Sequence, residues 1–201
     1  VDRRQRQMCI RDRPYPSPSL KPFVLVVFLL GLVSGSYAQA QSKDVLTAEV
    51  LGVYFTPPTG VSREITKHID SAKKTIVAQV YSFTDTKISE ALVRAKQRGV
   101  LVQLIQDSKA GVHNKETIRQ LTQAGIEVRQ DKVHMVAHNK VLVIDDEVVI
   151  TGSYNYTYGA DKNNAENAIA LKSNKLAEKY TANWKKHWAE SVAMPDQKKS
   201  N

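Results

Sequence analysis

Residues 138–155, HNKVLVIDDEVVITGSYN, constrain the fold of this chain more than any other segment. They contain two short runs rich in β-branched residues, at 141–144 and 148–151, separated by Asp145-Asp146-Glu147. Runs of this composition around a polar turn are typical of a β-hairpin. We therefore expect two paired strands whose free ends lie side by side.

The length of the turn decides which residues of the two strands face each other. If Asp146-Glu147 forms a two-residue turn, Lys140 lies opposite Ser153 and His138 lies opposite Asn155; a longer turn shifts this pairing by one residue. Alternate residues of a strand share a face, so His138 and Lys140 project together. The open end gathers an imidazole, an ammonium, a hydroxyl and an amide. These groups suit an anionic phosphodiester, because they supply a nucleophile or base, a cation and hydrogen-bond donors.

In this segment the chain resembles the phospholipase D superfamily. The superfamily signature is H-x-K-x(4)-D followed by G-S-x-N, and every position is present: His138, Lys140, Asp145, Gly152, Ser153 and Asn155. The resemblance extends over roughly residues 49–191, to the small bacterial nucleases of the superfamily. Three further segments carry it: VYSF at 80–83, KQRGV at 96–100 and NAEN at 164–167. The alternative is an ordinary buried hairpin with a polar end.

The resemblance implies a two-step phosphodiesterase mechanism. His138 attacks phosphorus and forms a phosphohistidine, which water then hydrolyses. Lys140 and Asn155 hold the non-bridging oxygens of the substrate. Outside residues 1–40 the chain has no cysteine, and it has no H-E-x-x-H motif or D-x-D with partner carboxylates near the hairpin. We therefore expect no metal and no other cofactor.

Three further residues of the predicted site have supporting roles by the same resemblance. Ser153 and Glu166 support the site, and Glu166 is expected to orient the imidazole of His138, fixing its tautomer and stabilising the imidazolium. Asp145 is expected to be structural, or to support the residues that contact the substrate without contacting it itself.

The chain carries one copy of the signature, whereas larger members of the superfamily carry two. A second HNK triplet, His113-Asn114-Lys115, lacks both the following Asp and the G-S-x-N, and we expect it to be solvated. The leaving oxygen must be protonated on the side opposite the nucleophile, and a histidine suits that acid role. The resemblance therefore implies a twofold homodimer in which each chain contributes one His138 to a shared site.

The substrate follows from the branch of the superfamily that the chain resembles. That branch favours an endonuclease acting on DNA, with RNA as a further candidate. A phospholipid headgroup is the alternative substrate, and a non-catalytic module that binds nucleic acid or a surface is the alternative from another class. Tyr154, Tyr156 and Tyr158 either stack against bases or pack in the interior.

The remaining histidines and several basic residues have simpler interpretations. His134 lies in an expected loop, where it lines the cleft or faces water. His68 and His187 lie on expected helices and are interpreted as structural. A group of basic residues on the helices is expected to form a solvated face: Lys73, Lys74, Arg94, Lys96 and Arg98.

The first forty residues are set apart from the domain. Residues 1–13 are rich in arginine without periodicity; they resemble translated adapter sequence, or form a disordered basic arm. Residues 14–40 contain Lys21, an apolar run at 22–33 and Ala38-Gln39-Ala40. This pattern predicts a secretory signal peptide cleaved after Ala40 or Ala38, with an uncleaved anchor as the alternative. We expect a periplasmic or secreted protein without stable membrane association after cleavage.

Residues 41–201 are long enough for a single domain with its own core. Residues 1–40 hold six basic and two acidic residues, so their removal lowers the formal net charge from +9 to +5. Such a balance permits a polyanionic partner. The only cysteine, Cys9, lies in the first segment, so no disulfide is expected in the domain.

Strand-like and helix-like segments alternate along the domain. Besides the hairpin, strands are expected at 48–55, 75–83, 100–106, 126–129 and 165–171. Helices are expected at 62–73, from about 86 to Gly99, at 115–124 and at 175–191. This alternation predicts an α/β fold with a mixed β-sheet flanked by helices on both faces.

Overall fold

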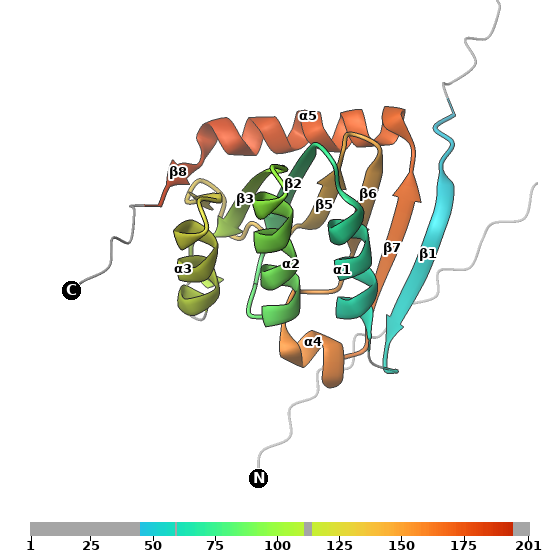
Figure 1. Cartoon of the computed structure of the whole chain (residues 1–201), viewed down its shortest axis with the longest axis horizontal. Helices are drawn as coiled ribbons and strands as arrows, with labels where there is room; N and C mark the ends of the chain where they lie inside the picture. The colour runs from blue at the N-terminus through green and yellow to red at the C-terminus, as the bar shows by residue number, and fades with distance from the viewer. Residues whose placement is uncertain (1–44, 59, 111–113, 195–201) are drawn as a thin grey trace, which may run out of the picture. The chain divides into compact units, whose positions relative to one another are not determined.

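The central feature of the fold is an eight-stranded mixed β-sheet with helices on both of its faces (Figure 1). The computed structural model describes residues 45–58, 60–110 and 114–194. The predicted α/β class and sheet are confirmed. The predictions for residues 1–13 and 14–40 and for His113 lie outside the described residues. Within the described ranges, no helix combines the length and the apolar character needed to cross a bilayer.

The strands and helices follow the predicted order closely. The strands are β1 (Glu49–Thr56), β2 (Thr75–Val80), β3 (Leu101–Asp107), β4 (Glu127–Asp131), β5 (Lys140–Ile144), β6 (Val148–Gly152), β7 (Glu166–Lys172) and β8 (Val192–Ala193). The helices are α1 (Val61–Ser71), α2 (Thr86–Gln97), α3 (Lys115–Gln123), α4 (Tyr158–Lys162) and α5 (Asn174–Glu190). Only α4 and β8 have no counterpart among the predicted elements.

The sheet order places the predicted hairpin at the centre. The strands run β1-β7-β6-β5-β2-β3-β4-β8, with parallel pairing among β2, β3 and β4 and antiparallel pairing elsewhere. As a result, one edge of the sheet collects the ends of β1, β2, β3, β4 and β6 and the starts of β5 and β7. We call this the site edge; its strand-terminal residues are Thr56, Val80, Asp107, Asp131, Lys140, Gly152 and Glu166.

Helices bury the two faces of the sheet unequally. On one face α1, α2 and α3 lie side by side (Figure 1) and form the larger core, with fully buried Ile65, Ile88 and Leu104 among its members. On the other face α5 packs against β5 and β6 through Ala177, and the indole of Trp184 donates a hydrogen bond of 2.9 Å to a β2 carbonyl. Strand β5 is buried along its whole length, as expected for a central strand covered on both faces.

The hairpin turn contains three residues. Asp145 and Asp146 have φ values of 54° and 53°, and the N–H of Glu147 donates to the carbonyl of Ile144 at 3.0 Å. Aspartate tolerates this left-handed conformation, which matches the twist of the flanking strands. Ile144 therefore pairs with Val148. Continued along the hairpin, this register puts Lys140 opposite Gly152, so the pairing predicted for a two-residue turn is wrong and the longer-turn alternative holds.

Candidate active site

Lys140 is a buried cation at the start of β5. It is 5% exposed, and its Nζ lies 5.1 Å from the centroid of the Tyr81 ring. The Nζ donates a hydrogen bond of 2.7 Å to the carbonyl of His138. Burial lowers the pKa of Lys140 to about 8, while the negative charge of Glu166 opposes that shift. The ammonium is thus held in a poorly solvated place where its field is weakly screened.

The imidazole of His138 is exposed beside this cation. Its ring packs 4.7 Å from the Tyr81 ring, centroid to centroid, with a tilt of 54°. The side chain between them in sequence, Asn139, instead donates to Gln79 Oε1 at 3.1 Å. His138 and Lys140 therefore share Tyr81 as a common wall, as their spacing predicts. An anion can therefore reach this imidazole, and an imidazole nitrogen is chemically capable of nucleophilic attack.

Gly152 and Ser153 are placed by the close approach of β6 and β7. A Cβ on Gly152 would lie 2.3 Å from the carbonyl oxygen of Asn167 and 2.9 Å from Cα of Ala168. The same carbonyl accepts the N–H groups of Ser153 and Tyr154, each at 3.1 Å. The glycine of the signature is thus required sterically, because only a residue without a side chain lets the strand end here.

Ser153 and Glu166 form a hydrogen-bonded pair at the site edge. The hydroxyl of Ser153 donates to Glu166 Oε2 at 2.6 Å, and Asn164 Nδ2 donates to Oε1 at 3.0 Å. The backbone N–H of Glu166 donates to Thr56 Oγ1 at 3.1 Å. Among the described residues, this carboxylate makes no hydrogen bond to His138, so orientation of the imidazole by Glu166 stays a prediction.

Asn155 follows at the same end of the hairpin. Its Oδ1 is buried and has no hydrogen-bond partner within the described part of the chain. The Nε2 of Gln79 is also buried and also lacks a partner there. Buried amide atoms are nearly always satisfied in folded proteins. Because Oδ1 is an acceptor, it suits a donor group of a ligand, whereas a phosphate oxygen would have to be held by the Nδ2 donor of the same amide.

Asp145 lies at the other end of β5 from Lys140, about 15 Å away along the strand. Its Oδ1 accepts the N–H groups of Lys74 and Thr75 at 2.7 and 2.9 Å, and its Oδ2 accepts that of Lys73 at 2.9 Å. Burial acts to raise the pKa of Asp145, but these three donors hold it below its usual range. Asp145 therefore joins the hairpin to the connection between α1 and β2 and does not touch the open end.

The site edge favours an anion. Helices α1, α2 and α3 all begin there, and helix N-termini carry partial positive charge. Four carboxylates on this edge are buried and accept backbone N–H groups: Asp85, Asp107, Asp131 and Asp161. Exposed lysines on its loops and helix starts include Lys87, Lys109 and Lys132. By contrast, Arg94 and Arg98 of the predicted solvated face pair with Asp70 away from this edge.

Two of the three tyrosines after the hairpin belong to the interior. Tyr154 and Tyr156 are 1% and 2% exposed, so base stacking by these two is excluded and the packing alternative holds. Burial raises the pKa of both phenols above the ordinary value. The ring of Tyr156 packs edge-on against Phe83 at 5.7 Å, and its carbonyl accepts the N–H groups of Thr84 and Asp85. Tyr158 is exposed.

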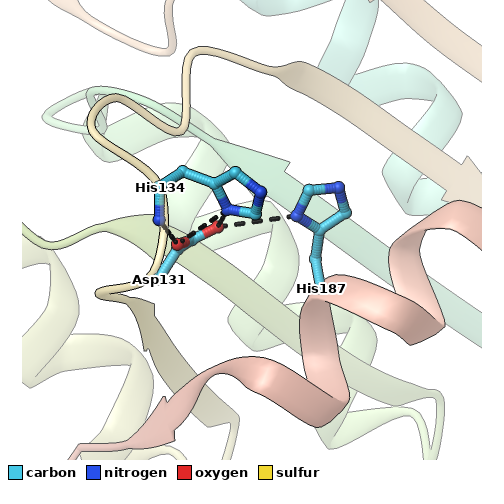
Figure 2. A group of neighbouring side chains, drawn as sticks. All are labelled: Asp131, His134 and His187. Atoms are coloured by element: carbon cyan, nitrogen blue, oxygen red, sulfur yellow. Dashed lines mark hydrogen bonds and ion pairs between the residues drawn. The ribbon is translucent and has the colours of Figure 1, made fainter.

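Sequence reasoning missed one polar cluster near the site edge. Asp131 Oδ2 lies 2.9 Å from Nδ1 of His134 and 3.5 Å from Nδ1 of His187 (Figure 2). His134 is therefore bonded to a carboxylate and does not merely line a cleft or face water. Asp131 and His134 give a D-x-x-H signal in the sequence, but His187 lies on a helix more than fifty residues later.

Comparison with known proteins identifies the family. Residues 65–188, which include the whole signature, match the family described as "Cardiolipin synthase, PLD-like domain". The chain is 44% identical to a phospholipase D of Rickettsia prowazekii, over 80% of this chain and 89% of that protein. The chain belongs to the phospholipase D family. It is therefore a phosphodiesterase hydrolase.

Two further relatives are similar to this phospholipase D family member over two thirds or more of its length. A mitochondrial cardiolipin hydrolase of Chlamydomonas reinhardtii is 33% identical, over 67% of this chain and 60% of that protein. Among solved structures, Nuc from Salmonella typhimurium, itself a phospholipase D family member, superposes with a TM-score of 0.71 and 32% identity. That match covers 74% of this chain and 99% of Nuc.

Proposed function

We propose that this family member is an endonuclease that cleaves DNA, with RNA as a further candidate, through a phosphohistidine and without a metal ion. The observation that carries the proposal is the buried ammonium of Lys140 beside the exposed imidazole of His138. A cation already removed from water stabilises developing negative charge without reorganising solvent during the reaction. This is the role that a metal ion has in other phosphodiesterases.

In the first step an imidazole nitrogen of His138 attacks phosphorus and the bond from phosphorus to the leaving oxygen breaks. A general acid supplies the proton that the leaving oxygen takes. Lys140 and the Nδ2 donor of Asn155 hold the non-bridging oxygens. The pair of Ser153 and Glu166 keeps that end of the hairpin in place. In the second step water attacks the phosphohistidine, gives its proton to the conjugate base of that acid, and frees His138.

A nucleic acid fits the charges around this site. The buried carboxylates of the site edge are stabilised by backbone N–H donors, whereas Lys87, Lys109 and Lys132 are exposed and present their charge to solvent. Three helix N-termini add positive potential along the same edge. A polyanion that extends on both sides of the cleaved phosphate would use this whole edge, while a single headgroup would use only its centre.

A phospholipid is the second candidate, and one surface feature favours it. Val133, Met135 and Val136, in the loop just before His138, are exposed, Met135 by 82%. Exposed apolar side chains beside a site suit an acyl chain or a bilayer surface. The names of the Rickettsia and Chlamydomonas relatives also refer to phospholipid chemistry. The reaction at His138 would be the same.

The substrate test incubates the protein with plasmid DNA and, separately, with phosphatidylcholine and cardiolipin vesicles, each with and without EDTA. We expect DNA cleavage that survives excess EDTA and is absent from His138→Ala. Loss of cleavage in EDTA that Mg²⁺ restores would contradict the metal-free mechanism. Headgroup release without DNA cleavage would show that the substrate is a phospholipid and not DNA. A Val133→Ser/Met135→Ser variant separates the candidates, because it should impair vesicle hydrolysis and spare DNA cleavage.

We propose a twofold dimer with a shared site as the source of the general acid. The chain carries one signature, and the histidine four residues before His138, His134, is bonded to Asp131. A second His138 from the partner chain would supply the proton. Wild-type and His138→Ala chains are unfolded and refolded together. If both histidines are needed, activity at an equal mix is about one quarter of wild type; about one half would show that each chain acts alone.

We propose that the domain acts outside the cytoplasm, on the basis of the signal-peptide pattern in residues 14–40. Fractionation of expressing bacteria should place the activity in the periplasm or medium. The N-terminus of the active protein should begin at Gln41 or Gln39. An active cytoplasmic protein that retains residues 14–40 would contradict export.

A further inference from the structure

One carboxylate and two imidazoles converge where α5 meets the end of β4 (Figure 2). Asp131 is the last residue of β4 and is 2% exposed. His134 comes from the following loop, and His187 comes from the last turn of α5. Two segments far apart in the sequence, the end of β4 with its following loop and the last turn of α5, thus place three potential ligand atoms within 4.8 Å of one another.

The spacing of these atoms matches a metal site. Both imidazoles approach the same oxygen of Asp131, His134 Nδ1 at 2.9 Å and His187 Nδ1 at 3.5 Å. The two rings lie 4.8 Å apart, centroid to centroid. An ion with four tetrahedral bonds of about 2.0–2.2 Å needs ligand atoms about 3.3–3.6 Å apart. The distance from Asp131 Oδ2 to His187 Nδ1 already lies in that range, and the distance from Oδ2 to His134 Nδ1 is a few tenths of an ångström below it.

The nitrogen of His187 is an independent sign of a missing ligand. Its Nδ1 is buried and has no hydrogen-bond partner within the described residues, although it faces the carboxylate of Asp131. A buried ring nitrogen without a partner is unfavourable in a folded protein. A bound cation would take its lone pair and remove that penalty.

The carboxylate is already oriented for this purpose. Oδ1 of Asp131 accepts the N–H groups of Val133 and His134, each at 3.1 Å. These bonds leave Oδ2 directed toward the two imidazoles (Figure 2). Hydrogen bonds to the non-ligating oxygen are the usual way in which proteins fix a carboxylate ligand.

We propose that Asp131, His134 and His187 bind one divalent transition-metal ion of the zinc class. Two imidazole nitrogens and one carboxylate oxygen suit a cation of borderline softness. The partly exposed side chain of His134 leaves a fourth position open to water. The ion is structural and separate from the hydrolytic reaction, because His138 and Lys140 lie outside the cluster.

The ion would act on the loop that delivers the nucleophile. Residues 132–139 connect β4 to β5 and end at His138-Asn139. The far end of this loop is held by Asp107, whose Oδ2 accepts the N–H of Ala137 at 2.8 Å. A metal bond to His134 and His187 would fix the near end to α5. Metal binding therefore stabilises the fold and the position of this loop together.

The first experiment uses the metal alone as the probe. The full chain is freed of metal with a chelator, and Zn²⁺ binding is measured by calorimetry and Co²⁺ binding by visible absorption. We expect one equivalent per chain and a Zn²⁺-dependent rise in Tm. His134→Ala and His187→Ala should each weaken binding about 100-fold or more. His68→Ala is the matched control and should bind Zn²⁺ normally, because His68, on α1, is bonded to the hydroxyl of Tyr54 in β1.

The second experiment needs no substitution, so a variant that misfolds cannot obscure the result. Wild-type protein is treated with diethyl pyrocarbonate with and without Zn²⁺, and modified histidines are identified by mass spectrometry. Zn²⁺ should protect His134, whereas the exposed His138 should react equally in both samples. Protection of His138 alone, failure to bind Zn²⁺, or full binding by the His134→Ala/His187→Ala double variant would each overturn the proposal.

Discussion

The two ends of the β5–β6 hairpin carry parts of one signature but differ in how their polar groups are satisfied. At the turn, both oxygens of Asp145 accept backbone N–H groups, three in all. At the open end, Lys140 donates only to the carbonyl of His138 among the described residues. The Oδ1 of Asn155 has no partner there.

This difference separates the structural and chemical parts of the motif. A saturated carboxylate has little left to offer a substrate, so the aspartate contributes to folding. Partly satisfied groups in a poorly solvated place retain their capacity for a ligand, at some expense of stability. The contrast predicts that substitutions at the open end change turnover and that substitutions at the turn change the free energy of unfolding.

The largest expected effect is at His138. His138→Ala should abolish turnover, together with the acid-labile phosphoenzyme seen after rapid quenching with labelled substrate, and should leave the fold intact. His113→Ala is the matched control, because it alters the other HNK triplet and should retain activity. An active His138→Ala variant would show that this histidine is not the nucleophile. An inactive His113→Ala variant would show that the triplet at 113–115, and not that at 138–140, belongs to the site.

Lys140 comes next. Lys140→Ala should lower kcat by about 10²-fold, as the loss of one group that stabilises the transition state usually does. Lys73→Ala, at the turn end, should retain near-normal kcat. Lys73 bonds Asp145 through its backbone N–H, which the substitution keeps. Equal losses of kcat in the two variants would show that the open end and the turn end of the hairpin do not differ in their contribution to turnover.

The pH dependence gives a smaller effect. The pKa of Lys140 is about 8, so its ammonium is lost above that pH, and kcat/KM should fall about tenfold per pH unit there. Stability should change in the opposite sense. The unfolded chain, with a pKa near 10.5, binds the proton more tightly, so Lys140 destabilises the fold less as pH rises from about 8 to about 10.5.

Lys140→Arg tests the assignment of that alkaline limb. Arginine keeps its charge throughout this range, so any activity that remains should lose the limb near pH 8. A limb that stays at the same pH in Lys140→Arg would show that another group titrates.

Asp145 should have the smallest effect on turnover. Asp145→Ala should lower the free energy of unfolding by about 2–3 kcal/mol, measured by urea denaturation, because three backbone N–H groups lose a charged acceptor. The folded variant should keep near-normal kcat. Asp146→Ala is the neighbouring control, since the Asp146 carboxylate accepts one bond, from the hydroxyl of Thr181 at 3.2 Å. A folded but inactive Asp145→Ala variant would place the aspartate in the chemistry.

Much of the fold was predictable because its elements are marked locally. Apolar spacing locates α1, α2, α3 and α5, and Gly99, at a φ of 90°, ends α2 as predicted. Helix α4 was missed because five residues give no periodicity, although the cap by Thr157 is a usable signal. The turn length was ambiguous because Asp145-Asp146 contains no glycine to mark the left-handed positions.

The site was predictable to a different extent. Its residues form a contiguous motif, so their gathering at one end follows from strand geometry alone. The hydrogen-bond donors to Glu166 did not follow from the sequence, because one comes from the end of the hairpin and the other from the loop before β7: Ser153 and Asn164. The cluster of Asp131, His134 and His187 depends on how α5 crosses the sheet, which no local pattern records.

The position of β7 between β1 and β6 has a consequence for biosynthesis. The N–H of Glu166 reaches the hydroxyl of Thr56, 110 residues earlier in the chain. As the polypeptide leaves the ribosome, β1 has no strand to pair with until β7 has been made. The hairpin likewise lacks one of its two neighbours. The site edge is therefore complete only after β7 has been translated, because Glu166 and the carbonyl that accepts the N–H of Ser153 belong to that strand.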